Sequence, residues 1–169
     1  MMPRERVINA LLIEESDRVP IGEELIWGRV LKEALGRITV HGDQALRLRM
    51  LASGKRDRLV EREKKDIVDL VKKFKLDIYM VSTNVAEEYT KPVEIEKNKW
   101  MLRSENAEDY SILSYCPSSQ VVNEIESNIN SVESFKDYVR RREQSKDAPD
   151  QTSFEVLEHV AGKIGDKVF

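Results

Sequence analysis

The residues best placed to do chemistry are Ser82 and Asn84, in the polar stretch that follows the short apolar run Leu76–Val81. A short β-favouring apolar run predicts a buried strand. In an α/β barrel, the loop at the carboxyl end of a strand lies at the mouth of the active site. The hydroxyl and the amide can both hydrogen-bond a substrate there, although neither carries a charge. We therefore expect Asn84 and Ser82 to be pocket residues, with a loop Asn that makes a turn as the alternative.

Other reactive side chains are few and scattered. The chain has one cysteine, Cys116, and two histidines, His41 and His159, with no spacing typical of metal ligands. We therefore expect no metal site. Cys116 has no identifiable basic neighbour to activate its thiol, which favours a small residue at a strand end over a nucleophile. We expect His41 to be an exposed turn residue and His159 to be a surface or boundary residue.

The composition excludes several classes of protein. A length of 169 residues with 40% hydrophobic and 35% charged residues fits one domain with a core and a charged surface. The formal net charge of −3 gives no electrostatic reason to expect binding to nucleic acid or to an acidic membrane. The single cysteine fits a reducing compartment, and the apolar run at residues 10–13 is too short for a signal peptide or a membrane span. These features predict a cytoplasmic protein.

The elements that must position these residues follow from periodicity and capping signals. Apolar residues at helical spacing predict four helices in the first part of the chain, at residues 3–16, 23–35, 43–51 and 57–75. Two strands, Val93–Arg103 and Tyr110–Tyr115, are predicted to form a hairpin that ends at Cys116 and Pro117. A helix is then predicted over Ser131–Glu143, and Thr152 with Glu155 forms a capping box for another, to about Lys163. The last residues, 167–169, are predicted to begin a new strand.

Several charged motifs occur in a fixed order along the chain. They are Arg4-Glu5-Arg6-Val7 with Ala10-Leu11, then Asp17-Arg18-Val19-Pro20, Leu35-Gly36-Arg37, an internal helix Asp (Asp66 or Asp69), Leu76-Asp77 and a hairpin around Trp100. Taken in this order, they resemble the uroporphyrinogen decarboxylase superfamily. Its members are tetrapyrrole decarboxylases and zinc-dependent methyltransferases that work with corrinoid proteins or thiol acceptors. We expect Arg4, Arg6, Asp17, Arg18 and Pro20 to be structural, with Asp17 paired to an arginine that fixes the turn.

The resemblance implies a (β/α)₈ barrel, which typically needs roughly 250 residues. We therefore expect an α/β, partial TIM-barrel-like structure in which residues 1–169 form the N-terminal portion of such a domain. Residues 1–75 would be a helical preface. Residues 76–169 would hold the first barrel strand, the excursion hairpin and the start of the second strand. Such a portion is expected to be inactive alone, and to self-associate or bind a complementing C-terminal chain.

The two branches of the superfamily differ at positions that can be compared here. The decarboxylase branch has an arginine-rich segment that grips substrate carboxylates, and an essential Asp at the end of its first strand. This chain has Trp27-Gly28-Arg29 and Asn84 in those places, and an amide carries no charge to stabilise a cationic pyrrole intermediate. The resemblance therefore favours the methyltransferase branch. Tetrapyrrole decarboxylation, a non-catalytic interaction module and a split-enzyme subunit remain the alternatives.

The methyltransferase branch implies cofactors that this chain is not expected to hold. That branch binds zinc through a His-x-Cys pair and a later Cys, all in the second half of the family's fold, and it works with a corrinoid protein. The zinc ion makes a thiol substrate a nucleophilic thiolate at neutral pH. We therefore expect no cofactor in this chain, and a corrinoid protein as a partner of the complete enzyme.

Overall fold

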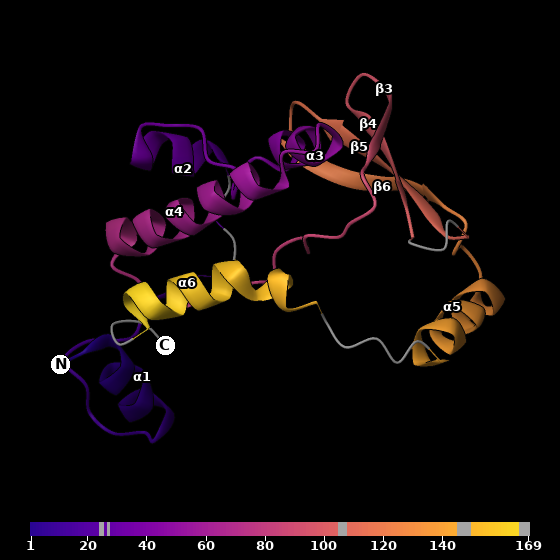
Figure 1. The fold of residues 1–169 in the computed structure, drawn as a ribbon. Coiled ribbons are helices and arrows are strands. Elements are labelled where there is room, and N and C mark those ends of the chain that lie inside the picture. The colour runs from indigo at the N-terminus through magenta and orange to yellow at the C-terminus, as the bar shows by residue number, and fades with distance from the viewer. Residues whose placement is uncertain (24–25, 27, 105–107, 145–149, 166–169) are drawn as a thin grey trace.

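The structure is a computed structural model, and it describes residues 1–169 apart from 24, 25, 27, 105–107, 145–149 and 166–169. Figure 1 shows two parts. Residues 3–79 together with 151–164 form the helical body, and residues 93–144 form an antiparallel sheet with one helix beside it. The chain is therefore mixed α/β, as the sequence predicts.

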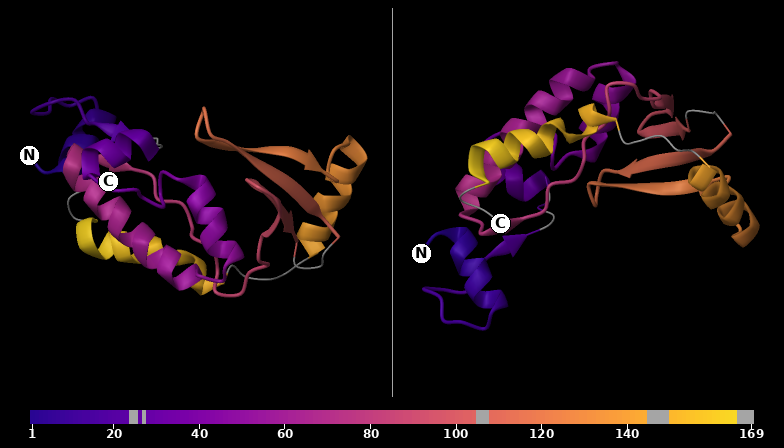
Figure 2. Two further views of the ribbon diagram at one scale, coloured as in Figure 1. Left: turned by 90° about the horizontal axis from the view of Figure 1, so that it is seen from above. Right: turned by 60° about the horizontal axis from the view of Figure 1, so that its bottom comes forward.

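The longest helix organises the helical body. The helices of this part are α1 (Pro3–Leu11), α2 (Gly28–Leu35), α3 (Gln44–Ala52), α4 (Arg56–Phe74) and α6 (Glu155–Ile164). α6 lies along α4, and α2 and α3 pack against other parts of it (Figures 1 and 2). Leu31, Leu70 and Val156 meet in this contact and are at most 2% exposed. Burial of such side chains stabilises the body by roughly 2 kcal/mol each.

Two short strands join the beginning of the body to its middle. β1 (Gly22–Glu23) pairs in parallel with β2 (Ile78–Tyr79), and the backbone N–H of Asp77 donates to the carbonyl of Ile21 at 2.7 Å. The predicted strand at residues 76–81 is thus shorter than expected. The predicted helix at residues 23–35 corresponds to α2 over Gly28–Leu35, and Glu23 lies in the strand pair instead.

The parallel partner of β2 comes from the segment after the opening motif. The predicted strand at residues 167–169 lies outside the described residues. β2 is also less buried than a barrel strand is expected to be, since Ile78 is 37% exposed and Met80, just after it, is 60% exposed. Within the described part of the chain, neither sheet closes into a barrel. The barrel therefore stays a prediction.

The antiparallel sheet is larger than the predicted hairpin. Its strands are β3 (Val93–Glu96), β4 (Lys99–Arg103), β5 (Tyr110–Cys116) and β6 (Val121–Ser127), paired in that order. The prediction of one strand over residues 93–103 is wrong because Asn98 adopts a left-handed conformation (φ 63°) that reverses the chain. Asn tolerates this conformation better than most residues. The sheet also continues beyond Cys116, where the sequence predicted its end, through a second turn at Gln120 (φ 58°).

One tryptophan anchors the sheet on the helical body. Trp100 of β4 is 0% exposed and packs in a cluster with Ala45 and Leu48 of α3. The guanidinium of Arg49 lies 5.9 Å from the centroid of the Trp100 ring, within the range of a cation–π contact. The side-chain oxygen of Gln44 accepts a hydrogen bond of 3.0 Å from the N–H of Val122 in β6. The sheet is therefore attached mainly through α3.

The two remaining predicted helices are present, with one different cap. α5 (Val132–Gln144) lies beside the sheet, away from the body (Figure 2). The predicted Thr152 capping box is wrong, because residues 151–154 form a 3₁₀ turn before α6 begins. Asp150 caps that turn by accepting from the N–H of Thr152, whose hydroxyl oxygen instead accepts from the N–H of Glu87. In the described residues, every helix is too short or too polar to span a bilayer.

Candidate functional site

The amide of Asn84 is used inside the protein. The side chain is 7% exposed, its Nδ2 donates to the carbonyl of Thr152 at 2.8 Å, and its Oδ1 accepts from the N–H of Val156 at 3.0 Å. Asn84 therefore satisfies a backbone donor in the first turn of α6 and holds this helix against the segment after β2. Ser82 is exposed. Neither residue lines the cavity described below, so their pocket role stays a prediction.

The charges of the opening motif meet in one ion-pair network. The Nε and Nη2 of Arg6 donate to the two carboxylate oxygens of Asp17 at 2.6 and 2.9 Å, which confirms the predicted pairing of Asp17 with an arginine. Arg6 also bonds Asp77, and Arg18 reaches the same carboxylate at 2.6 Å. Asp77 is 0% exposed and accepts from the N–H of Ile21 as well. The network therefore fastens α1 and the following turn to β2, while Arg4 is exposed and Pro20 half-buried.

This network changes the acidity of its two carboxyl groups. The guanidinium of Arg6 holds the pKa of Asp17 well below its usual range, although desolvation opposes the shift. Burial alone would raise the pKa of Asp77, but hydrogen bonds from the N–H of Ile21 and from the side chains of Arg18 and Arg6 together lower it. Both carboxylates are therefore charged at neutral pH and act as structural anions.

A second network holds the loop that follows α2. Arg37, from the Leu-Gly-Arg motif, bonds Asp66 of α4 and reaches Asp69 at 2.7 Å. Asp66 is 1% exposed, and its other oxygen accepts from the N–H of Val40 at 2.7 Å. These contacts fix the course of residues 37–42 across α4. The loop in turn forms one wall of a cavity.

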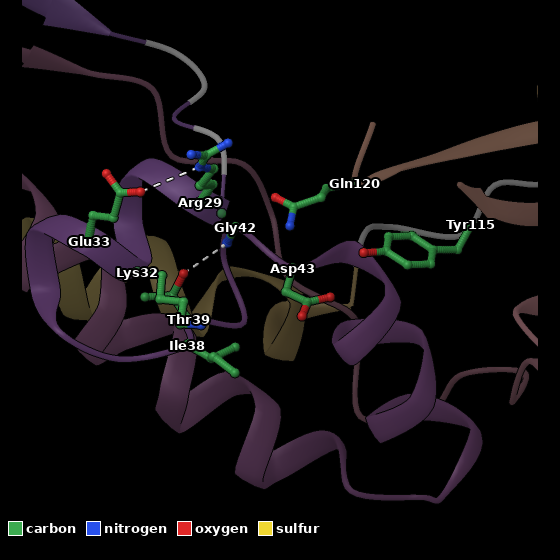
Figure 3. Close-up of a pocket in the computed structure, with 10 residues that line it drawn as sticks. Arg29, Lys32, Glu33, Ile38, Thr39, Gly42, Asp43, Tyr115 and Gln120 are labelled. Carbon is green, nitrogen blue, oxygen red and sulfur yellow. Dashed lines mark hydrogen bonds and ion pairs between the residues drawn. The ribbon is translucent and has the colours of Figure 1, made fainter. Parts of the chain in front are cut away.

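The cavity lies between α2, this loop and the turn that joins β5 to β6 (Figure 3). Its volume is about 410 Å³, and its lining residues are Gly28, Arg29, Lys32, Glu33, Ile38, Thr39, Gly42, Asp43, Tyr115 and Gln120. Two of the lining glycines lie in close backbone contact, since a Cβ on Gly28 would lie 2.3 Å from the carbonyl oxygen of Gly42. Only glycine allows the two backbones to approach so closely at these positions.

The charges around the cavity are partly satisfied. Arg29 and Glu33 form an exposed ion pair with a distance of 3.4 Å (Figure 3). Asp43 caps α3, since its Oδ1 accepts from the N–H of Leu46 at 2.8 Å, as the sequence predicts. Among the described residues, the ammonium of Lys32 has no hydrogen bond or ion pair, and Oδ2 of Asp43 has no partner. The cavity therefore presents one cation and one anion that are free to bind a ligand.

The sheet contributes two neutral polar groups to the same cavity. These are the hydroxyl of Tyr115 and the side-chain amide of Gln120, neither of which has a hydrogen-bond partner in the described part of the chain. Sequence reasoning missed this site, because its lining residues come from three separate segments and carry no motif. The available signals were Gly28 and Gly42, but their contact spans 14 residues and cannot be foreseen from spacing.

His41 belongs to the same loop and contacts Tyr79 of β2. Its Nε2 is 2.5 Å from the hydroxyl of Tyr79, and the ring is half-buried, so the predicted exposed turn residue is wrong. Burial lowers the pKa of His41, an effect that Asp66 opposes and Arg47 adds to. Burial also raises the pKa of Tyr79 to about 12. His41 is therefore neutral at pH 7 and shares a hydrogen bond with the Tyr79 hydroxyl, while His159 is half-buried, a boundary residue as predicted.

Cys116 is the last residue of β5, next to the turn beside the cavity, but it does not line the cavity. Its sulfur is 3.1 Å from the hydroxyl oxygen of Ser118, and hydrogen bonds from Ser118 and Ser119 lower the pKa of the thiol to about 6. The thiol is thus more acidic than the sequence indicates, because serines two and three residues further along supply the donors. Among the described residues, no three His, Cys, Asp or Glu side chains come together in a way that could hold a metal ion.

Comparison of the chain with protein-family models, with curated proteins and with solved structures found no match.

Proposed function

We propose that the chain is the N-terminal portion of a uroporphyrinogen-decarboxylase-like (β/α)₈ enzyme of the methyltransferase branch. Such an enzyme moves a methyl group between a corrinoid or methylated substrate and a thiol or corrinoid acceptor. The observation that supports this proposal best is the parallel pair of β1 and β2, fastened by the bonds of Arg6 and Arg18 to Asp77. These charges belong to the motifs that carry the resemblance, and parallel strands separated by helices are the repeating unit of an α/β barrel.

In this proposal the chain contributes scaffold and not chemistry. Its described residues do not fit the zinc site of the methyltransferase branch, because His41 and Cys116 lie apart and no metal-binding group forms around either. We therefore assign no step of methyl transfer to this chain. The zinc ligands and the surface for a corrinoid protein would come from the remainder of the barrel, in the cytoplasm.

The remainder of the barrel would cover surface that the helical body leaves open. Met80 is 60% exposed, and Leu157 of α6 is 39% exposed. Beside them, an apolar hollow of about 140 Å³ is lined by residues that include Val81 and Val160. Exposed apolar surface next to open strand edges favours association. We propose that the isolated chain self-associates or binds a complementing chain, which light scattering coupled to size exclusion measures directly. A monodisperse species of 19.6 kDa would contradict this proposal.

A non-catalytic interaction module is the second candidate. It is favoured by the position of α5 and the antiparallel sheet, which extend away from the helical body (Figure 2). Val132 and Phe135 of α5 are 64% and 57% exposed, so this helix offers apolar side chains to a partner. Tetrapyrrole decarboxylation has less support, because Arg29, in the region of the arginine-rich segment, is paired with Glu33.

Fragment complementation tests the proposal. The chain is co-expressed with the C-terminal part of a zinc-dependent methyltransferase of this superfamily, starting after its own N-terminal portion. The purified pair is assayed for transfer of the methyl group of methylcobalamin to a thiol, followed by the absorbance of the corrinoid. We expect transfer by the pair and none by either part. A stable complex without transfer would favour the interaction module, loss of carboxylates from uroporphyrinogen would favour the decarboxylase, and the absence of a complex would contradict the proposal.

A further inference from the structure

We infer that the cavity of Figure 3 binds a small zwitterion, a molecule that carries one carboxylate and one ammonium group, such as a free amino acid. The inference rests on the unpaired charges of Lys32 and Asp43, which line the same cavity. Neither Lys32 nor Asp43 belongs to the motifs that carry the family resemblance. The site therefore stands whether or not the chain is part of a methyltransferase.

The charge pattern selects the ligand class. Arg29 and Glu33 neutralise each other at the rim, which leaves Lys32 on α2 and Oδ2 of Asp43 at the start of α3. A ligand carboxylate would accept from the Lys32 ammonium, and a ligand ammonium would donate to Asp43. Hydrogen bonds between charged groups are about twice as strong as those between neutral groups. A ligand with only one charge would leave the opposite protein charge unpaired, so the cavity discriminates by charge.

The sheet side of the cavity indicates a polar, neutral ligand side chain. Figure 3 shows the Tyr115 hydroxyl and the Gln120 amide on the side of the cavity where Asp43 lies. Gln120 adopts a left-handed conformation (φ 58°), which is uncommon for a residue other than glycine. Together the two groups offer both donors and acceptors to an amide or hydroxyl.

The cavity has the size and the preformed walls that a small-molecule site needs. Its volume of about 410 Å³ falls in the range of roughly 300–1,000 Å³ that such sites occupy. The contact between Gly28 and Gly42 fixes α2 against the loop, and Asp66 holds that loop on α4. An amino acid fills part of this volume, which leaves room for water.

The test uses L-glutamine and two analogues that each lack one of its charges. Glutaramate keeps the carboxylate and lacks the amine, and γ-aminobutyramide keeps the amine and lacks the carboxylate. Each is titrated into the ¹⁵N-labelled chain, and the dissociation constant is taken from amide shifts of residues around the cavity. We expect L-glutamine to bind about tenfold more tightly than either analogue, with the largest shifts at the cavity. Equal binding of all three, shifts elsewhere only, or no binding would overturn the inference.

Two substitutions test which protein charge binds which charge of the ligand. Lys32→Gln should make L-glutamine bind no better than γ-aminobutyramide, and Asp43→Asn should make it bind no better than glutaramate. Asn keeps the cap of α3, because its side-chain oxygen still accepts from the backbone, so the second variant stays folded. Lys72→Gln, on the exposed face of α4, is the matched control and should bind as the parent does. Loss of affinity in the control alone, or in none of the three, would equally overturn the inference.

Discussion

The helical body and the antiparallel sheet are stabilised by different kinds of contact. The body brings together residues that are far apart in sequence, such as Arg6 and Asp77, which are separated by 71 positions. The sheet pairs each strand with the next one along the chain. Trp100 is its only described residue that is fully buried, and the rest of its strands are half-buried or exposed.

This difference shows what the motif residues do in the structure. Six charged residues of the ordered motifs form ion pairs that join separate segments of the body, namely Arg6, Asp17, Arg18, Arg37, Asp66 and Asp77. A substitution of one of them should therefore destabilise the contact between distant segments. A change in the sheet should act locally, except where the sheet is anchored.

The largest effect is expected at that anchor. Trp100→Ala should lower the free energy of unfolding by about 3–5 kcal/mol, because it leaves a cavity between β4 and α3. Since Trp100 is the main apolar link, the sheet should lose protection against amide hydrogen exchange before α4 does. Urea denaturation followed by circular dichroism gives the first quantity, and exchange measured by mass spectrometry gives the second. Trp100→Phe is the control and should cost less. Equal loss of protection in both parts would mean that sheet and body form one cooperative unit.

The next effect is expected at the centre of the charge network. Asp77→Ala should cost about 3 kcal/mol, because it removes one of the two carboxylates that pair with the buried guanidinium of Arg6, together with the partner of the part-exposed Arg18. The loss should appear in α1 and β1, which this carboxylate holds. Asp57→Ala removes a carboxylate whose side chain is 89% exposed and should cost less than about 1 kcal/mol. Similar costs for the two variants in urea denaturation would show that the network does not join these segments.

A smaller effect is expected at the rim of the same network. Asp17 is 45% exposed and binds Arg6, so Asp17→Ala should lower the melting temperature by roughly 3 °C. The Arg6 guanidinium lowers the pKa of Asp17 from an unfolded value of 3.8. The unfolded chain therefore takes up the proton first, and the stabilisation is complete above pH 3.8 and is lost as the pH falls below it. Melting curves at neutral and acid pH should show the two proteins converging in acid. A constant difference would contradict this account.

Sequence reasoning succeeded where a signal was local. Asp43 was predicted to cap α3 and does so, and α4 and α5 lie within one or two residues of their predicted bounds. It failed where the chain reverses or pairs over a long distance. The turn at Asn98 lies in the polar stretch of residues 96–99, which was interpreted as part of one continuous strand. β1 was missed because its partner lies 56 residues further on.

Among the candidate site residues, local pairings could likewise be predicted and long-range ones could not. Asp17 was paired correctly with an arginine because both belong to one motif, but its connection to Asp77 through Arg6 depends on the fold. Lys32 and Gln120 come together only because the sheet is docked on α3. No periodicity or spacing encodes that docking. The pocket was therefore beyond what the sequence alone can predict.

The smallest effect is expected at His41, whose burial should make the stability of the helical body depend on pH. The ring faces Tyr79 on β2, Asp66 on α4 and Arg47 on α3, and Arg47 is itself paired with Glu63. Burial lowers the pKa of His41 from 6.5, so the unfolded chain binds a proton more readily than the folded one. The stabilisation is thus complete above pH 6.5 and is lost as the pH falls through the lowered value.

The substitution His41→Gln separates this titration from the hydrogen bond. Glutamine can still hydrogen-bond the Tyr79 hydroxyl but does not titrate. The melting temperature of the variant should therefore be nearly constant just below pH 6.5, where that of the parent falls by about 2 °C. His159→Gln, at a half-buried position within α6, is the matched control and should keep the slope of the parent. A slope that survives in His41→Gln would assign the pH dependence to another group. It would also mean that the contact between the loop and β2 is looser than the ion pairs that hold the rest of the body.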